Sequence, residues 1–298
     1  MSNSRFGFKT RKGEIDGILG NQILRTLDVF TGSVGSFSLQ KIREAYSGSS
    51  VRVRRSSDNS EQDIGFSTSG QFDEQSLNSF CSGTNGFVTT WYDQSEYPNN
   101  ATMGTALNQP KIYDSVSGIY YENTRPTIFF NNNQLLVNNL TLVLQPVSYF
   151  FVAKGQSTAR QGNIISKNSF FAASFSDFPF VISLKNTFIS ASVSRGNDFS
   201  SDVSLTRVTT GNLQVYSVFQ SVSQLGISID SDLETTPSVT QSANTRVYSM
   251  GKASVENGGG VNTSGYTGYI SEIIIYPFTQ LSNREEIERK MKIFYNIS

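Results

Sequence analysis

The chain has 298 residues, of which 37% are hydrophobic and 12% aromatic, a composition that suits a folded protein with one extensive core. Lysine plus arginine and aspartate plus glutamate both number 24, so the formal net charge is zero. The chain therefore has no overall positive charge that would attract nucleic acid or an acidic membrane. The absence of histidine and the single cysteine exclude Ser-His-Asp or Cys-His catalysis, histidine-based metal sites and an internal disulfide. We therefore expect no metal or other cofactor, and we interpret Cys81 as a small buried residue.

Residues 1–27 are predicted to form an arm ahead of a main domain at residues 28–298. The segment RFGFKTRK combines two phenylalanines with four positive charges and has no regular periodicity. Such a tail can anchor on a partner surface, and a disordered tail is the alternative. No signal-type apolar run opens the chain and no apolar stretch approaches the length of a membrane span, so we expect neither signal-directed export nor a membrane span. The candidate docking residues are Arg5, Phe6, Phe8, Lys9, Arg11 and Lys12.

Two early segments are predicted to be helices. In residues 36–47, apolar side chains recur at three- and four-residue spacing and a glycine follows that can end the helix. In residues 73–81, Asp73 can cap the N-terminus. The side chains expected to face inward are Leu39, Ile42 and Tyr46 in the first helix and Leu77, Phe80 and Cys81 in the second.

The stretch VRVRRSSD at residues 51–58 alternates in a way that predicts a strand. We expect the valines on one face, with Arg55, and expect Arg52 and Arg54 on the other face, where they meet carboxylates of neighbouring strands. Asp58 is expected to cap the following turn. The alternative, a phosphate or nucleic-acid surface, would need more basic residues in register.

From residue 86 onward, short apolar segments alternate with Gly, Asn, Ser and Asp clusters, which predicts strands and turns. Several segments are apolar on both faces, as the inner strands of a layered sandwich are, and their spacing argues against βαβ units. The run ENGGGVNTSG at 256–265 is predicted to be a loop, because no Lys-Ser/Thr follows the glycines. The predicted strands are GFVTTWYD, RPTIFF, SYFFVAKG, FPFVISLKN, TFISASVS, LQVYSVFQ, TRVYSMGK and GYISEIIIYPF.

The C-terminal segment SNREEIERKMKIFYNIS is predicted to be a helix. Ser282 and Glu285 have the spacing of a capping box, and Ile287, Met291 and Phe294 form one apolar stripe. We expect this helix to pack on the sandwich, and binding of a partner is the alternative.

The stretch TTWYDQS places the chain's one tryptophan, Trp91, beside Tyr92 and Asp93. In the first interpretation this is a structural corner, where Asp93 accepts backbone N–H groups in an Asx-type turn and one aromatic ring faces the core. In the second, the three residues contact a glycan, since aromatic rings stack on sugars and a carboxylate accepts their hydroxyls. We favour the corner and retain the trio as candidate glycan contacts.

Four stretches together resemble a known family: AYSGSSVRVRRSSDNSEQDIGF, FDEQSLNSFC, GFVTTWYDQS and NATM. They are similar to the N-terminal part of the catalytic domain of family 54 α-L-arabinofuranosidases, a pattern also found in bacterial and phage proteins. The resemblance is specific over about residues 43–105 and weaker, but collinear, through the C-terminal helix. It implies an all-β, concanavalin A-like jelly-roll β-sandwich with a few short helices and a C-terminal helix.

The resemblance also identifies where catalytic carboxylates would stand. A retaining glycosidase needs two carboxyl groups about 5 Å apart. The nucleophile position of the family falls on Lys185 in ISLKNTF, and the acid/base position falls near Ala253 in MGKASVEN. The adjacent cysteines of the family's sugar pocket have no counterpart in NIISKN, and a second cysteine pair is reduced to Cys81. The comparison implies a protein that is not an enzyme.

Three functions follow as hypotheses. The first is a non-enzymatic structural protein of a virus particle, such as a capsid decoration, head fibre or tail-associated module. It would be made in the host cytoplasm, form homo-oligomers, and attach to other capsid or tail proteins through its arm. The second is a carbohydrate-binding module that recognises host-surface glycans. The third is an active glycoside hydrolase with shifted carboxylates, for which the candidates are Glu256, Asp177 and Asp198.

Overall fold

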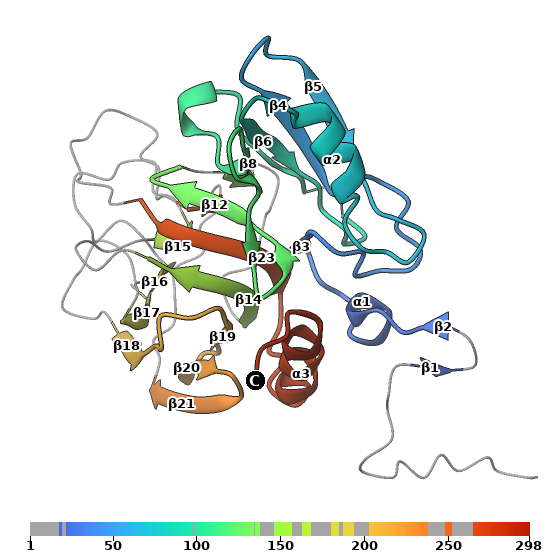
Figure 1. Ribbon diagram of the computed structural model, residues 1–298. Coiled ribbons are helices and arrows are strands. Elements are labelled where there is room, and N and C mark those ends of the chain that lie inside the picture. Colours follow the sequence, from blue (N-terminus) through green and yellow to red (C-terminus); the bar gives the residue numbers. More distant parts are fainter. Residues whose placement is uncertain are drawn as a thin grey trace, which may run out of the picture.

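Figure 1 shows the computed structural model of the chain, in which the described residues form antiparallel strands with three short α-helices. The all-β prediction is confirmed. The structure describes residues 18–19, 22–97, 99–133, 135–137, 146–156, 163–167, 180–184, 187–193, 203–237, 248–251 and 265–298. Sequence positions singled out above that lie outside this part are Arg5, Phe6, Phe8, Lys9, Arg11, Lys12, Asp177, Lys185, Asp198, Ala253 and Glu256. The predicted glycine-rich loop also lies outside it, up to residue 264.

A first run of strands has the order β21-β20-β19-β14-β23. The free side of β23 pairs with β3 along one half of its length and with β12 along the other half. Helix α3 lies against this run, next to β19 (Figure 1). The strands are β3 (Gly35–Ser38), β12 (Ile128–Asn131), β14 (Val147–Gly155), β19 (Gln214–Gln220), β20 (Gln224–Ile229), β21 (Asp232–Pro237) and β23 (Thr267–Tyr276).

A second run has the order β18-β17-β16-β15-β22-β13-β7, and β7 pairs in turn with β6. Strand β6 also pairs with β4 and β8, while β8 pairs with β12 and so joins the second run to the first. The strands are β4 (Val51–Arg55), β5 (Glu61–Ile64), β6 (Gly86–Trp91), β7 (Ala101–Thr102), β8 (Lys111–Asp114), β9 (Gly118–Ile119), β13 (Leu135–Val137), β15 (Asn163–Lys167), β16 (Phe180–Leu184), β17 (Phe188–Val193), β18 (Val203–Val208) and β22 (Tyr248–Met250).

Smaller elements complete the fold. Two short hairpins pair β1 with β2 and β10 with β11. No helix among the described residues has the length and apolar character needed to cross a membrane. The elements are β1 (Ile18–Leu19), β2 (Gln22–Ile23), β10 (Tyr121–Glu122), β11 (Arg125–Pro126), α1 (Thr26–Val29), α2 (Glu74–Cys81), α3 (Arg284–Phe294) and the 3₁₀ turn Ala106–Asn108.

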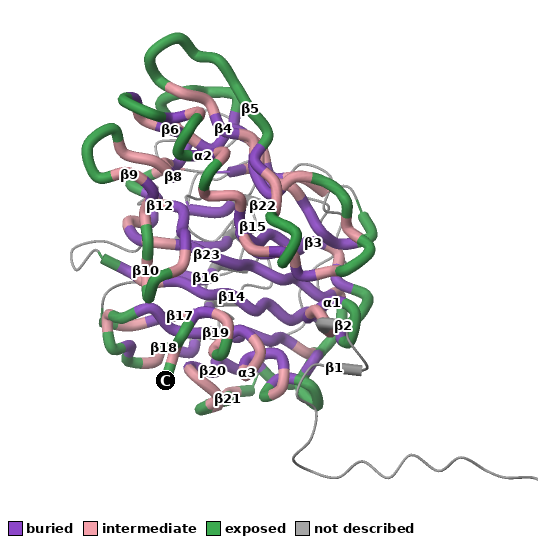
Figure 2. Tube along the Cα trace, turned by 45° about the vertical axis from the view of Figure 1, so that its right-hand side comes forward, coloured by how far each residue is buried: buried purple, intermediate pink, exposed green. Residues whose placement is uncertain are grey.

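The central strands are buried on both faces, as Figure 2 shows for the purple tube through β14 and β23. Successive side chains of a strand point to opposite faces. In β14, Phe151 therefore enters the core between the two runs, whereas Phe150 and Val152 enter a second cluster beneath α3. This double burial explains why SYFFVAKG is almost continuously apolar, and it fixes α3 against the sandwich as predicted.

Of the two predicted helix N-terminal caps, the structure contains one and lacks the other. Asp73 accepts a hydrogen bond from Ser76 N at 3.0 Å and caps α2, and Cys81 is buried, as predicted. Burial raises the pKa of the Cys81 thiol to about 11, which suits an inert core residue. The predicted capping box at the C-terminus is wrong, because α3 begins only at Arg284 and its N-cap, Asn283, makes no side-chain cap.

The helix predicted at residues 36–47 is also wrong, since Gly35–Ser38 is strand β3 and the following residues form irregular structure. Leu39 packs in the core between the strand runs, while Ile42 packs in the cluster beneath α3. Their three-residue spacing therefore reflects burial in two separate clusters rather than one helical face.

The chain is already packed before the predicted boundary at residue 28. That boundary falls inside α1, and Leu27 is 3% exposed within the cluster beneath α3. Arg25 forms an ion pair with Glu44 at 3.1 Å and donates to Ser69 O at 3.2 Å. The packed part of the chain thus includes residues that the sequence assigns to the arm.

Candidate functional site

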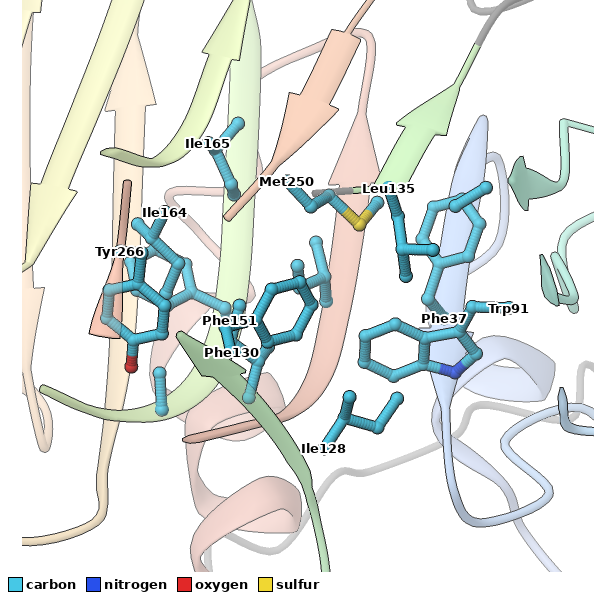
Figure 3. Packing of buried hydrophobic residues seen from close by; sticks show 14 of the residues in the cluster. Phe37, Trp91, Ile128, Phe130, Leu135, Phe151, Ile164, Ile165, Met250 and Tyr266 are labelled. Carbon is cyan, nitrogen blue, oxygen red and sulfur yellow. The ribbon is translucent and has the colours of Figure 1, made fainter. Parts of the chain in front are cut away.

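The residues of the WYD corner, Trp91, Tyr92 and Asp93, follow one another at the end of β6 but occupy different environments. Trp91 is 0% exposed, and its ring lies 6.0 Å from that of Phe37. Figure 3 shows both side chains among the buried hydrophobic residues of the core. A ring inside the core has no free face on which a sugar can stack. Trp91 is therefore a core residue, and the candidate assignment of Trp91 as a glycan contact is wrong.

Asp93 is 4% exposed and closes the corner, as the structural interpretation predicts. Its carboxylate accepts hydrogen bonds from Ser36 N at 2.7 Å and Ser95 N at 2.8 Å, the second being the Asx-type turn. Ser95 Oγ and Asn99 N also donate to it. Burial raises the pKa of Asp93 to about 6, although these hydrogen bonds oppose the shift. The enclosed carboxylate holds β3 against the corner. The candidate assignment of Asp93 as a glycan contact is therefore wrong.

Tyr92 is the half-buried member of the corner. Its hydroxyl donates to Asp63 Oδ1 at 2.7 Å, and Arg52 donates to both oxygens of the same carboxylate at 2.8 and 2.7 Å. Burial and this hydrogen bond raise the pKa of Tyr92 to about 12. The predicted partner of Arg52 is thus confirmed, whereas Arg54 instead bonds two amide oxygens, those of Gln109 and Asn59.

A buried carboxylate that the sequence reasoning missed lies on β23. Glu272 is 0% exposed, and its Oε2 accepts hydrogen bonds from Ser38 Oγ, Gln40 Nε2 and Tyr295 Oη at 2.8, 2.9 and 2.9 Å. Burial raises the pKa of Glu272. The sequence signal was a lone glutamate within the apolar run ISEIIIY. Among the described residues, no group of three or more acidic or cysteine side chains could hold a metal ion.

A pocket of about 440 Å³ lies between α3, the chain entering α1 and the loops near residues 40 and 70. Its lining includes Gln40, whose Nε2 donates to Glu272. We call it the basic pocket, because the charged side chains that line it are Arg25, Lys41, Arg125, Arg289 and Lys290.

The cations of the basic pocket differ in how they are paired. Arg25 and Lys41 share Glu44, at 3.1 and 3.8 Å, and Arg289 pairs with Glu286 at 2.7 Å. Among the described residues, Arg125 and Lys290 form no ion pair. Burial lowers the pKa of Lys290, with nearby Glu286 opposing the shift. No sequence pattern predicts this pocket, since its residues come from segments far apart in the chain.

Arg125 is held in place by the C-terminal helix. Its Nε donates to Phe294 O at 2.8 Å, its Nη1 donates to Gln71 Oε1 at 3.0 Å, and its guanidinium lies 4.3 Å from the centre of the Phe294 ring. No hydrogen bond to a described residue uses Nη2. The guanidinium is therefore oriented by neutral groups, with donors left for a ligand in the pocket.

The arrangement of the two strand runs defines the protein as a β-sandwich of the concanavalin A-like class. Comparisons with known proteins show which sequence family and which solved structures it resembles. A sequence model described as "Alpha-L-arabinofuranosidase B, catalytic" matches residues 31–122. A solved glutamine mutant of a GH54 α-L-arabinofuranosidase, soaked with 4-nitrophenyl α-L-arabinofuranoside, has a TM-score of 0.65 and 15% identity, and covers 89% of this chain. An arabinofuranosidase complexed with arabinofuranosyl-α-1,2-xylobiose has a TM-score of 0.65 and 14% identity, and also covers 89%.

The resemblance predicted from the sequence motifs is thus confirmed, and with it the sandwich fold. The matched motifs contain β4, α2 and the WYD corner, so the part that resembles the family at sequence level is the scaffold described above. This chain spans only 64% of the length of these two solved chains. A search of curated proteins found no match.

Proposed function

We propose that this chain is a non-catalytic structural or attachment protein of a virus particle, which displays an arabinofuranosidase-like sandwich tethered by its N-terminal arm. The observation that carries the proposal is the lysine at position 185, where the family resemblance locates the catalytic nucleophile. An ammonium group cannot form the glycosyl ester that a carboxylate nucleophile forms. A saccharide-binding fold that lacks the nucleophile is suited to recognising a sugar without cleaving it.

The arm supports attachment to other virion proteins. Its RFGFKTRK segment offers cations and aromatic rings that can dock on a capsid or tail surface. The chain joins the sandwich at α1, where Leu24 O accepts a hydrogen bond from Lys290 Nζ at 3.3 Å. The arm is thus rooted on α3, at one side of the sandwich. Repetition by particle symmetry would bring several copies together.

The first test is peptide mass spectrometry on density-purified particles from the source culture. We expect the protein at a fixed ratio to the major capsid protein, and we expect deletion of residues 1–17 to remove it from particles while leaving the sandwich folded. A matched control replaces the arm's four cations by glutamine and keeps both phenylalanines, which separates charge from length. Absence of the intact protein from particles would refute the virion assignment.

The second test concerns catalysis. We expect no release of nitrophenol from 4-nitrophenyl α-L-arabinofuranoside above the uncatalysed rate, with an active GH54 enzyme measured in parallel. Lys185→Glu alone is expected to restore nothing, because the acid/base position also lacks a carboxylate. Turnover by the wild-type chain that disappears in Glu256→Gln would instead establish a hydrolase with shifted carboxylates.

A further inference from the structure

We propose that the basic pocket is a binding site for an acidic sugar, a hydroxylated ring that carries a carboxylate. The inference deepens the proposed recognition function and rests on it only for the expectation that the ligand is a saccharide. The site itself is carried by the described residues. It lies at the root of the arm, between α3 and the loop that follows β3.

The charge balance of the basic pocket favours an anion. Two carboxylates, Glu44 and Glu286, form ion pairs with three of its five lining cations. Asp28 accepts hydrogen bonds from the backbone N–H groups of Arg25 and Glu44, and Glu272, whose pKa is raised by burial, accepts one from Gln40 of the lining. The surplus positive charge comes from Arg125 and Lys290, which form no ion pair among the described residues.

The geometry of Arg125 favours a carboxylate in particular. Arginine presents a planar fork of donors that matches the two oxygens of a carboxylate, and bidentate pairs of this kind are strong and directional. Its Nε–H is used by Phe294 O and one Nη1–H by Gln71 Oε1, which orients the guanidinium and leaves the second Nη1–H and the Nη2 donors for the two oxygens. Little conformational freedom therefore remains to be lost on binding.

The remaining lining suits the body of a sugar. Thr26, Gln40, Ser69 and Gln71 provide hydroxyl and amide groups that can exchange hydrogen bonds with sugar hydroxyls. Apolar side chains, which include those of Ile42 and Phe294, contribute to the wall and can pack against the C–H face of a ring. A volume of about 440 Å³ lies within the range of small-molecule sites.

The test is isothermal titration calorimetry of the full chain with D-glucuronate, D-glucose and inorganic sulfate as probes. We expect saturable binding of glucuronate that weakens as salt is added, and binding of glucose and sulfate at least about tenfold weaker. Lys290→Gln and Arg125→Gln are each expected to weaken glucuronate binding about tenfold or more, the loss typical of one charge-assisted hydrogen bond.

Lys292→Gln is the matched control, because it removes one positive charge from α3 outside the pocket lining. Lys290→Gln guards against a folding artefact, since Lys290 forms no ion pair with a described residue and its hydrogen bond to Leu24 O is long, at 3.3 Å. Unchanged binding in both pocket variants, or no saturable glucuronate binding, would overturn the site. Equal affinity for sulfate would overturn the sugar class, and none of these results bears on whether the protein is present in particles.

Discussion

Trp91→Ala is expected to destabilise the protein by about 3–5 kcal/mol, the typical cost of removing a large aromatic side chain from a packed core. Trp91 is 0% exposed and packs with Phe37 of β3 in the core between the two runs, so its loss leaves a cavity there (Figure 3). Val51 on the neighbouring strand pairs with Trp91 in register and would lose packing as well. Urea denaturation followed by circular dichroism measures the change.

Tyr92→Phe is the matched control for this substitution. It removes one hydroxyl and its hydrogen bond to Asp63 and keeps the ring, so we expect a loss of no more than about 1 kcal/mol. A comparable loss in the two variants would contradict the assignment of Trp91 to the core. The two variants also help to interpret later binding assays, because reduced glycan binding by Trp91→Ala would report unfolding rather than a lost contact.

The parts of the fold that the sequence predicts well are those fixed by local pattern. Helix α2 follows from Asp73 and the inward spacing of Leu77 and Cys81, which act within one turn or two. Strands β14 and β23 follow from long apolar runs, because only strands covered on both faces need them. The family motifs then supply the sandwich, which local patterns do not distinguish from other all-β folds.

The parts that sequence reasoning misses depend on contacts between distant segments. Ile42 and Leu39 look like one helical face, and only the tertiary structure shows that a strand run separates their two clusters. Trp91 looks accessible because tyrosine and aspartate follow it, yet its neighbour Phe37 is 54 positions earlier in the sequence. The basic pocket is similar, as Arg125 of β11 and Lys41 of the loop after β3 come together only in the folded chain.

The buried ion pair of α3, between Arg284 and Glu288, is the second place where one substitution is expected to have a large effect. Glu288 is 0% exposed, and it accepts hydrogen bonds from Arg284 Nη1 at 2.9 Å and from Ser217 Oγ of β19 at 2.6 Å. Arg284, 6% exposed, also donates to Ser228 Oγ of β20 at 2.8 Å. The pair therefore ties the helix to two strands of the first run, in a place from which water is largely excluded.

Arg284→Ala is expected to lower the free energy of unfolding by about 3–5 kcal/mol, because it leaves the carboxylate of Glu288 buried without its counter-ion. Replacing both partners, by Arg284→Met with Glu288→Leu, is expected to restore much of this loss, since the desolvation cost of the two charges is removed with them. Arg289→Gln breaks the more exposed pair with Glu286 on the same helix and should cost less than about 1 kcal/mol. Urea denaturation of the wild-type protein and the three variants measures these losses of stability. Equal losses in Arg284→Ala and Arg289→Gln would show that the buried pair does not hold α3 to the sandwich.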